Sequence, residues 1–162
     1  MARDPAPDVM LQPLTGAARS VVEWVTMFHL AAVVVDPFAH ESAWLLSTAR
    51  RILEIYNGSD ARTAFIVTGT PEQARQFLGP LADEFLVFAD PDRAFVRSVG
   101  LERLPAWVHI NHLGGLEASA EGWDPDLWRD AAEHLAERMS WSRPQIPAPG
   151  DPVPYTGAPA LG

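Results

Sequence analysis

Three neighbouring residues carry groups that could do hydrolytic chemistry: His40, Glu41 and Ser42. A serine nucleophile needs a base within hydrogen-bond distance and a third group that orients the base. Residues this close together, just before an expected helix, seldom adopt that geometry, and the G-x-S-x-G pattern of a nucleophile elbow does not surround the serine. We therefore interpret Ser42 as the N-cap of the following helix and predict no catalytic residue.

Histidines offer a second kind of chemistry, because His109 and His112 have a spacing that could serve a metal ion. Their span runs from an expected strand into a turn and places the two rings on different faces, and the only nearby acid is Glu117. A pair of histidines that are hydrogen-bonded within the fold or exposed to solvent fits the sequence better than a metal site. His29 lies among apolar residues and is expected to be a hydrogen-bonded histidine of the core or its edge. The sequence thus predicts no metal and no cofactor.

The residue composition excludes most sulfur and amine chemistry. The 162 residues include no cysteine, and all 12 basic residues are arginine. Thiol catalysis, disulfides, zinc-thiolate sites and iron-sulfur clusters are therefore impossible within this chain, and so are lysine Schiff bases and P-loop chemistry. The chain is acidic, with a formal net charge of −9, which disfavours nucleic acids and anionic membranes as partners.

The length is that of one compact domain with modest tails. Prolines near both ends predict a flexible N-terminal tail over residues 1–14 and a proline-rich C-terminal tail over residues 141–162, around a domain at 15–140. The C-terminal tail is expected to be a linker or docking segment, or alternatively a polyproline ligand. The apolar stretch 21–35 is too short for a membrane span and unlike a signal peptide, so we expect a cytoplasmic protein. The composition is typical of a GC-rich bacterial genome.

Helical and strand periodicities alternate along the chain. Helices are expected at 16–28, 42–56, 71–81, 91–96 and 125–139, and strands at 29–35, 63–67, 84–88, 105–110 and 116–120. The last two strands are separated by a short loop of hairpin type. Strands separated by helices favour a parallel sheet, to which the hairpin adds an antiparallel edge. The predicted fold class is a three-layer α/β sandwich with helices on both faces of a mixed sheet.

The sequence resembles a family, the thioredoxin-fold proteins of the peroxiredoxin and TlpA-like branch. Four segments in the family's order carry the resemblance: Val33–Leu45, Val67–Gln73, Phe88–Arg93 and Val99–Val108. The first segment parallels the family's strand and the C-x-x-C at the start of the following helix, and the second parallels the connection from the next strand into its helix. The third parallels the family's D-P-D run, and the fourth parallels the loop whose proline is cis in the family. The resemblance covers about residues 16–139 and implies a thioredoxin-like fold.

The sequence departs from the family at its chemistry. Ser42 stands where the first cysteine would be and Leu45 where the second would be. A serine hydroxyl cannot form a redox couple, so this chain alone is predicted not to exchange disulfides or reduce peroxides. Asp36 matches the buried acid that moves protons for the family's thiols. The degenerate active-site positions are therefore Asp36, Ser42 and Leu45, and we expect a buried Asp36 to find a hydrogen-bond donor or to have a raised pKa.

The resemblance also implies a binding groove beside Pro105, where the preceding residue, Leu104, offers its backbone to an extended peptide. The expected groove residues are Ser42, Ala43, Trp44, Leu104, Pro105, Ala106 and Trp107. The two tryptophans would be aromatic anchors for a ligand, or alternatively core residues.

Three functions are compatible with the sequence. The first is a non-catalytic, cysteine-less thioredoxin-like domain that binds a protein or extended peptide, or acts as a scaffold. The alternative is an oxidoreductase of the thioredoxin and peroxiredoxin type whose reactive group comes from a partner or a cofactor. A third is a binder of small molecules or thiol compounds in the same cleft. We favour the first, because the framework is kept while the thiol pair is missing.

Overall fold

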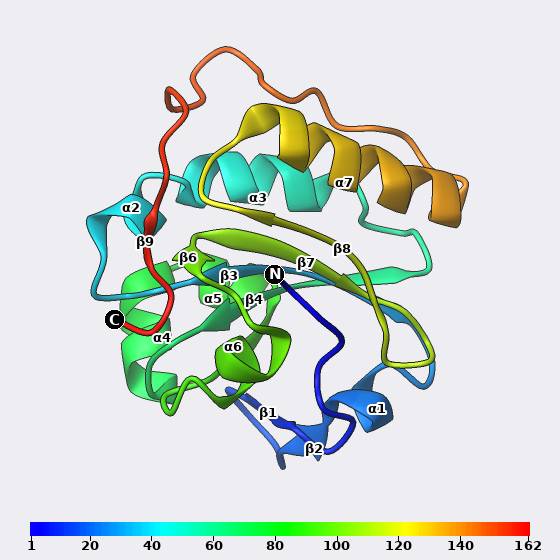
Figure 1. Ribbon diagram of the computed structural model, residues 1–162, viewed down its shortest axis with the longest axis vertical. Coiled ribbons are helices and arrows are strands. Elements are labelled where there is room, and N and C mark those ends of the chain that lie inside the picture. The colour runs from blue at the N-terminus through cyan, green and yellow to red at the C-terminus, as the bar shows by residue number, and fades with distance from the viewer.

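The computed structural model describes residues 1–162, and a seven-stranded mixed sheet crosses the molecule in the order β2-β1-β5-β4-β3-β7-β8 (Figure 1). Its centre is formed by three parallel strands, β3 (His29–Val35), β4 (Ala61–Val67) and β5 (Leu86–Ala89). Strand β7 (Ala106–Ile110) pairs antiparallel with β3, and β8 (Leu116–Glu121) pairs antiparallel with β7. The predicted parallel sheet with a hairpin at its edge is therefore present.

The strand at the centre explains the long apolar run in the sequence. All seven residues of β3 are buried, because β4 and β7 flank the strand and helices cover both of its faces. The protein has two hydrophobic core clusters, and alternate residues of β3 belong to each. Val33 and Val35 face one cluster, and Ala32 and Val34 face the other. A strand buried on both faces reads as continuous hydrophobic sequence rather than as an alternation.

Helices form the two outer layers. α3 (Leu46–Glu54), α4 (Pro71–Leu78) and α7 (Pro125–Met139) contribute to the core on one face, and α1 (Val21–Trp24) and α6 (Ala94–Val99) to the core on the other. In Figure 1, α3 and α7 lie side by side above the sheet. Two short helices, α2 (His40–Ala43) and α5 (Leu81–Glu84), complete the set. None of these helices has the length and apolar character that crossing a membrane requires.

The N-terminal region differs from its prediction. Residues 1–14 were expected to form a flexible tail, but β1 (Met10–Pro13) pairs antiparallel with β5 and joins the main sheet. Leu11 is fully buried, so this short segment is held by the core although its prolines suggest a loop. Of the helix predicted over 16–28, only the four residues of α1 are helical, and they directly follow β2 (Arg19–Ser20).

Two helix boundaries also differ. The predicted helix over 42–56 is divided into α2 and α3 by a turn at Trp44 and Leu45. The helix expected at 91–96 is displaced to α6, because the side chain of Asp90 accepts the backbone N–H groups of Phe95 and Val96. The starts of α4 and α7 agree with the prediction: Thr70 and Asp124 cap them, and each has proline in its first turn.

The proline-rich C-terminal segment lies along the domain instead of leaving it. Thr48 and Arg51 of α3 both bind the carboxylate of Asp151, each at 2.8 Å. The segment then descends past α2 to β9 (Ala158–Pro159), which pairs antiparallel with β6 (Arg103–Leu104) in a second, two-stranded sheet (Figure 1). This docking brings the end of the chain to the place where the sequence predicted a peptide groove.

Candidate functional site

The carboxyl end of β3 leads into the degenerate active-site positions. The backbone N–H of Asp36 donates to Ser42 Oγ at 2.9 Å, and the Ser42 side chain is fully buried. The hydroxyl therefore ties α2 to the end of β3. The prediction that Ser42 is an N-cap is wrong, because α2 begins at His40 and its N-cap is Ala39. The hydrogen bonds of Ser42 Oγ include no histidine, so the three residues do not form a hydrolytic triad.

Asp36 is buried and has found a donor, as expected. Its side chain is 5% exposed, and its Oδ2 lies 3.1 Å from Nη2 of Arg93. The other oxygen accepts the backbone N–H of Phe38 at 2.8 Å. Arg93 adopts the left-handed conformation, with φ of 58°, immediately before α6. The carboxylate that the resemblance links to proton transfer is thus committed to an ion pair.

The proline loop comes to the same end of the sheet. The peptide bond between Leu104 and Pro105 is cis. Ala106 pairs with Val34, which places Pro105 beside the end of β3, next to Asp36. The degenerate positions and the proline loop therefore lie at one end of β3, in the arrangement that the four matched segments implied. We call the surface between α2 and β6 the cis-proline groove.

The cis-proline groove is occupied by the chain's own C-terminal residues. Leu104 pairs with Ala158 and Arg103 pairs with Pro159. The backbone N–H of Ala160 donates to the carbonyl of Glu102 at 2.9 Å, which continues the pairing by one residue. The backbone of Leu104, which was predicted to receive an extended peptide, is already paired with one.

Tyr155 holds the same C-terminal segment on α2. Its hydroxyl donates to the carbonyl of Glu41 at 2.5 Å, and its ring meets Trp44 edge-on with centroids 5.5 Å apart. Burial raises the pKa of Tyr155, so the hydroxyl remains a donor. Backbone hydrogen bonds in both directions join Tyr155 to Trp123, at 2.8 and 3.0 Å. We call residues 155–160 the docked segment, because it spans the groove from α2 to β6.

Arg93 connects the docked segment to the buried acid. While its Nη2 pairs with Asp36, its Nη1 donates to the carbonyl of Ala160 at 2.6 Å. The side chain is 15% exposed, so this three-part contact is largely shielded from water. The sequence offered no signal for this role, since Arg93 is distant in the chain from both of its partners.

The predicted groove residues divide into three groups. Ser42, Leu104, Pro105 and Ala106 lie at the groove but are buried with the docked segment in place. Ala43, the last residue of α2, and Trp44, in the turn that follows, are exposed. Trp107 is not part of the groove, because it is fully buried in the core and its ring packs against Tyr56 and Trp128. Leu45, which the resemblance matches to the family's second cysteine, is also a core residue.

A histidine cluster lies at the opposite end of β3. Nε2 of the fully buried His109 is 2.8 Å from Nδ1 of His29, which confirms that His29 is a hydrogen-bonded core histidine. His112 is exposed and contacts the carbonyl of Val25, so it does not join His109 in a shared site. Glu117 and His134 lie beside His109 instead, with one ligand atom of each residue within 4.8 Å of the others. His134 is on α7, and no spacing in the sequence connects it to the other two.

The charge states of this cluster follow from its surroundings. Hydrogen bonds from Asn111 and His134 lower the pKa of Glu117 to about 2. Burial, together with the neighbouring His29, lowers the pKa of His109 to about 4. At neutral pH the cluster therefore combines a carboxylate with a neutral imidazole.

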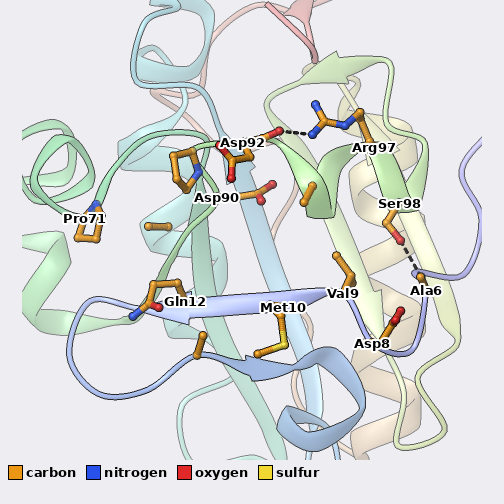
Figure 2. A pocket seen from close by; sticks show the side chains of 14 residues that line it. Ala6, Asp8, Val9, Met10, Gln12, Pro71, Asp90, Asp92, Arg97 and Ser98 are labelled. Atoms are coloured by element: carbon orange, nitrogen blue, oxygen red, sulfur yellow. Dashed lines mark hydrogen bonds between the residues drawn. The ribbon is translucent and has the colours of Figure 1, made fainter.

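A hollow of about 770 Å³ lies on the other face of the molecule, between the N-terminal segment and α6 (Figure 2). Apart from the carboxylates of Asp8 and Asp92, its polar side chains are hydrogen-bonded within the surrounding structure. Burial raises the pKa of Asp90, whose carboxylate caps α6, and the hydroxyl of Ser98 accepts the backbone N–H of Ala6 at 2.6 Å. Arg97 donates to the backbone carbonyl of Asp92. The two remaining carboxylates belong to separate segments and are both acidic, so they do not make the set of precisely placed polar groups that marks a ligand site.

Comparisons with known proteins agree with this architecture. No protein-family model matches the chain, and a search of curated proteins found no match. Among solved structures, a protein described as the thiol:disulfide interchange protein DsbE of Chlorobium tepidum superposes with a TM-score of 0.68 at 17% identity, covering 86% of this chain and 98% of its own. The bacterioferritin comigratory protein of Xanthomonas campestris, which has alkyl peroxide reduction activity, gives 0.61 at 12% identity, covering 85% and 92%.

One further structure extends over the terminal segments. Protein SMc02350 of Sinorhizobium meliloti 1021 superposes with a TM-score of 0.68 at 13% identity and covers 99% of this chain and 94% of its own. At such identities the likeness establishes the fold. The chain has the thioredoxin-like fold, as the four matched segments implied, and it has this fold without a cysteine.

Proposed function

We propose that this thioredoxin-fold chain is a non-catalytic protein-binding domain, whose cis-proline groove receives an extended segment of a partner protein by strand addition. The observation that carries the proposal is the pairing of β6 with β9. An antiparallel segment already lies on the edge that a partner segment would use. Main-chain pairing of this kind supplies affinity, and the flanking side-chain positions supply specificity.

The residues of the docked segment indicate which residue types a partner segment would need in the groove. Ala158 and Ala160 are buried at 8% and 1% exposure, whereas Pro159 between them is exposed. Gly157, with φ of 89°, leaves no room for a side chain, because a Cβ there would lie 2.5 Å from the carbonyl oxygen of Leu104. The groove therefore suits a glycine followed by a small residue, any residue and a second small residue.

The part of the docked segment that pairs with β6, residues 157–160, can leave β6 at a modest cost in free energy. A backbone hydrogen bond contributes about 0.5–1.5 kcal/mol net, and residues 157–160 make only a few of them. The hydrogen bond from Arg93 to the carbonyl of Ala160 is charge-assisted and adds about 1.5–3 kcal/mol. The anchors at Tyr155 and Asp151 are separate, so they would hold the rest of the C-terminal segment while residues 157–162 leave. A partner segment can therefore compete for β6 without unfolding the domain.

The alternative, an oxidoreductase with a borrowed reactive group, has less support. Asp36 is paired with Arg93 rather than free to transfer a proton, and Tyr155 covers the α2 end of the groove. Both contacts favour binding over thiol chemistry at this position.

The experiment that tests the proposal uses the chain's own segment as the ligand. A fluorescent peptide with the sequence of residues 156–162 is titrated, with fluorescence anisotropy as readout, into the full chain and into a variant that ends at Thr156. We expect the shortened variant to bind the peptide about tenfold more tightly, because the tethered segment competes at a millimolar effective concentration. A peptide with valine in place of glycine at the position of Gly157 is the matched control and should not bind. Equal binding by both proteins, or no binding by the shortened one, would refute the proposal.

A single substitution should open the groove in the full chain. In Gly157→Ala the new Cβ meets a backbone carbonyl oxygen that cannot move aside, so residues 157–160 should detach. Amide hydrogen exchange at Ala160, whose N–H is bonded to Glu102, should then be at least about tenfold faster. Gly150→Ala is the matched control, because Gly150 has a similar φ of 92° but open space around it. Unchanged exchange in Gly157→Ala, or equal acceleration in the control, would contradict this account of the groove.

A further inference from the structure

We propose that His109, Glu117 and His134 form a binding site for a divalent transition-metal ion of the zinc class. The three residues come from β7, β8 and α7, and one ligand atom of each lies within 4.8 Å of the others. Two imidazoles and one carboxylate are a ligand set that zinc uses when water takes its fourth position. His109 pairs with Ala31, so the site lies roughly 15 Å along the strand from the cis-proline groove and shares no residue with it.

An irregularity in the hairpin places Glu117 in the cluster. His109 pairs with Ala118, but the next residue, Ile110, pairs with Leu116, so Glu117 has no opposite residue on β7. A bulge of this kind redirects a side chain, and bulges are frequent beside functional sites. The carboxylate of Glu117 consequently reaches α7, where its Oε1 lies 2.8 Å from Nε2 of His134.

His109 has the second feature of a metal ligand. Its side chain is fully buried, and its Nδ1 has no hydrogen-bond partner. Because Nε2 already contacts His29 on β3, Nδ1 is the nitrogen that remains available to an ion. A buried nitrogen without a partner is destabilising, and a bound cation would remove that penalty.

His29 supplies the support that ligating histidines usually have. In metal sites the second ring nitrogen donates to an acceptor, which fixes the tautomer and the ring orientation. The contact of 2.8 Å between His109 Nε2 and His29 Nδ1 serves this purpose when His29 accepts. Asn111 holds the other oxygen of Glu117 in the same way, at 2.8 Å. Two of the three ligands are thus oriented by neighbours that would not contact the ion.

Small side-chain movements would complete the site. Donor atoms on tetrahedral zinc lie roughly 3.3 Å apart. Separations of up to 4.8 Å must therefore shorten, whereas the contact of 2.8 Å between Glu117 and His134 must lengthen as the ion replaces their hydrogen bond. His134 is 41% exposed and can rotate, and its exposure leaves an open side for water and for the arriving ion. Arg138 is the competitor, because its Nε lies 3.1 Å from the same Oε1 of Glu117. Metal binding therefore requires Arg138, itself 48% exposed, to swing into solvent.

The proposal is tested with zinc and cobalt on the full chain, prepared without an affinity tag and stripped with EDTA. Isothermal titration calorimetry with ZnCl₂ should show one ion per chain, and Co²⁺ should give visible absorption bands of low-coordinate histidine and carboxylate ligation. His134→Ala should weaken zinc binding by about 100-fold or more and abolish the cobalt bands. Since His134 is partly exposed, this variant should keep the circular dichroism spectrum of the parent.

Two further variants separate this site from adventitious binding. His40→Ala removes an exposed histidine on α2, away from the cluster, and should leave the zinc affinity unchanged. Arg138→Gln frees the carboxylate of Glu117 and should tighten zinc binding by about threefold to tenfold. The proposal is overturned if zinc does not bind, if His134→Ala binds as well as the parent, or if His40→Ala loses as much affinity. Unchanged affinity in Arg138→Gln would remove Glu117 from the ligand set and overturn the site as drawn.

Discussion

Replacing Trp107 with alanine should lower the free energy of unfolding by about 3–5 kcal/mol, the range for truncation of a large buried aromatic side chain. Trp107 is fully buried on β7, and its ring packs against Trp128 at 5.9 Å and Tyr56 at 6.2 Å between centroids. The cavity left by the indole cannot close without moving α7. Urea unfolding followed by circular dichroism measures the loss.

Trp107→Phe is the matched control for this variant. The indole Nε1 of Trp107 has no hydrogen-bond partner, so phenylalanine forfeits ring volume but no polar contact. We expect a loss of about 1–2 kcal/mol, well below that of alanine. Equal losses in the two variants would show that the indole N–H is satisfied and would contradict this description of the core. A loss under 1 kcal/mol in Trp107→Ala would contradict the burial itself.

Replacing Arg93 with methionine should cost about 3–5 kcal/mol of unfolding free energy, because it leaves the buried carboxylate of Asp36 without its cation. The same change removes the donor to the carbonyl of Ala160, so the docked segment should also loosen. Amide exchange at Ala160 and the urea unfolding midpoint report the two effects separately. Methionine keeps the aliphatic volume of the arginine stem, which limits the change to the charge and its hydrogen bonds.

The controls for Arg93→Met follow from the same ion pair. The double variant Asp36→Asn/Arg93→Met removes the unpaired charge and should be more stable than Arg93→Met alone. Arg50→Met breaks contacts with Glu54 and Glu84 on the surface, where Arg50 is 49% exposed, and should cost less than about 1 kcal/mol. If Arg93→Met costs no more than Arg50→Met, the pair with Asp36 has no structural importance.

The fold was predictable because its strongest signals are local. The apolar run of β3, the proline-started helices α4 and α7 and the hairpin of β7 and β8 can each be found in the sequence without tertiary information. The predictions that were wrong concern elements shaped by their neighbours. Four residues at Met10–Pro13 become a strand because β5 presents an open edge to them, and no local pattern indicates that edge.

The position of the candidate groove was predictable from the sequence, but its occupation by the chain's own C-terminal residues was not. Aligned segments put Ser42 and Pro105 at one end of β3, where the structure has them. That the last residues of the chain cover this end depends on the space at Gly157 and on the reach of Arg93. Trp107 was assigned to the groove as one alternative, but the alternation along β7 sends it to the face opposite Ala106. For the histidine cluster, the sequence brought His109 and Glu117 to attention, but it could not show that a strand bulge and His134 of a distant helix complete the group.

The hydroxyl of Ser42 joins α2 to β3 by a hydrogen bond and not by any sulfur bond. The opening and closing that we propose for the neighbouring groove would therefore consume no electrons. A change in glutathione poise or oxygen tension should leave the occupancy of β6 untouched, while the abundance of a competing segment should set it directly. In this chain, with a fold shared with electron-transferring proteins, the occupancy of β6 would depend only on the concentration of the competing segment.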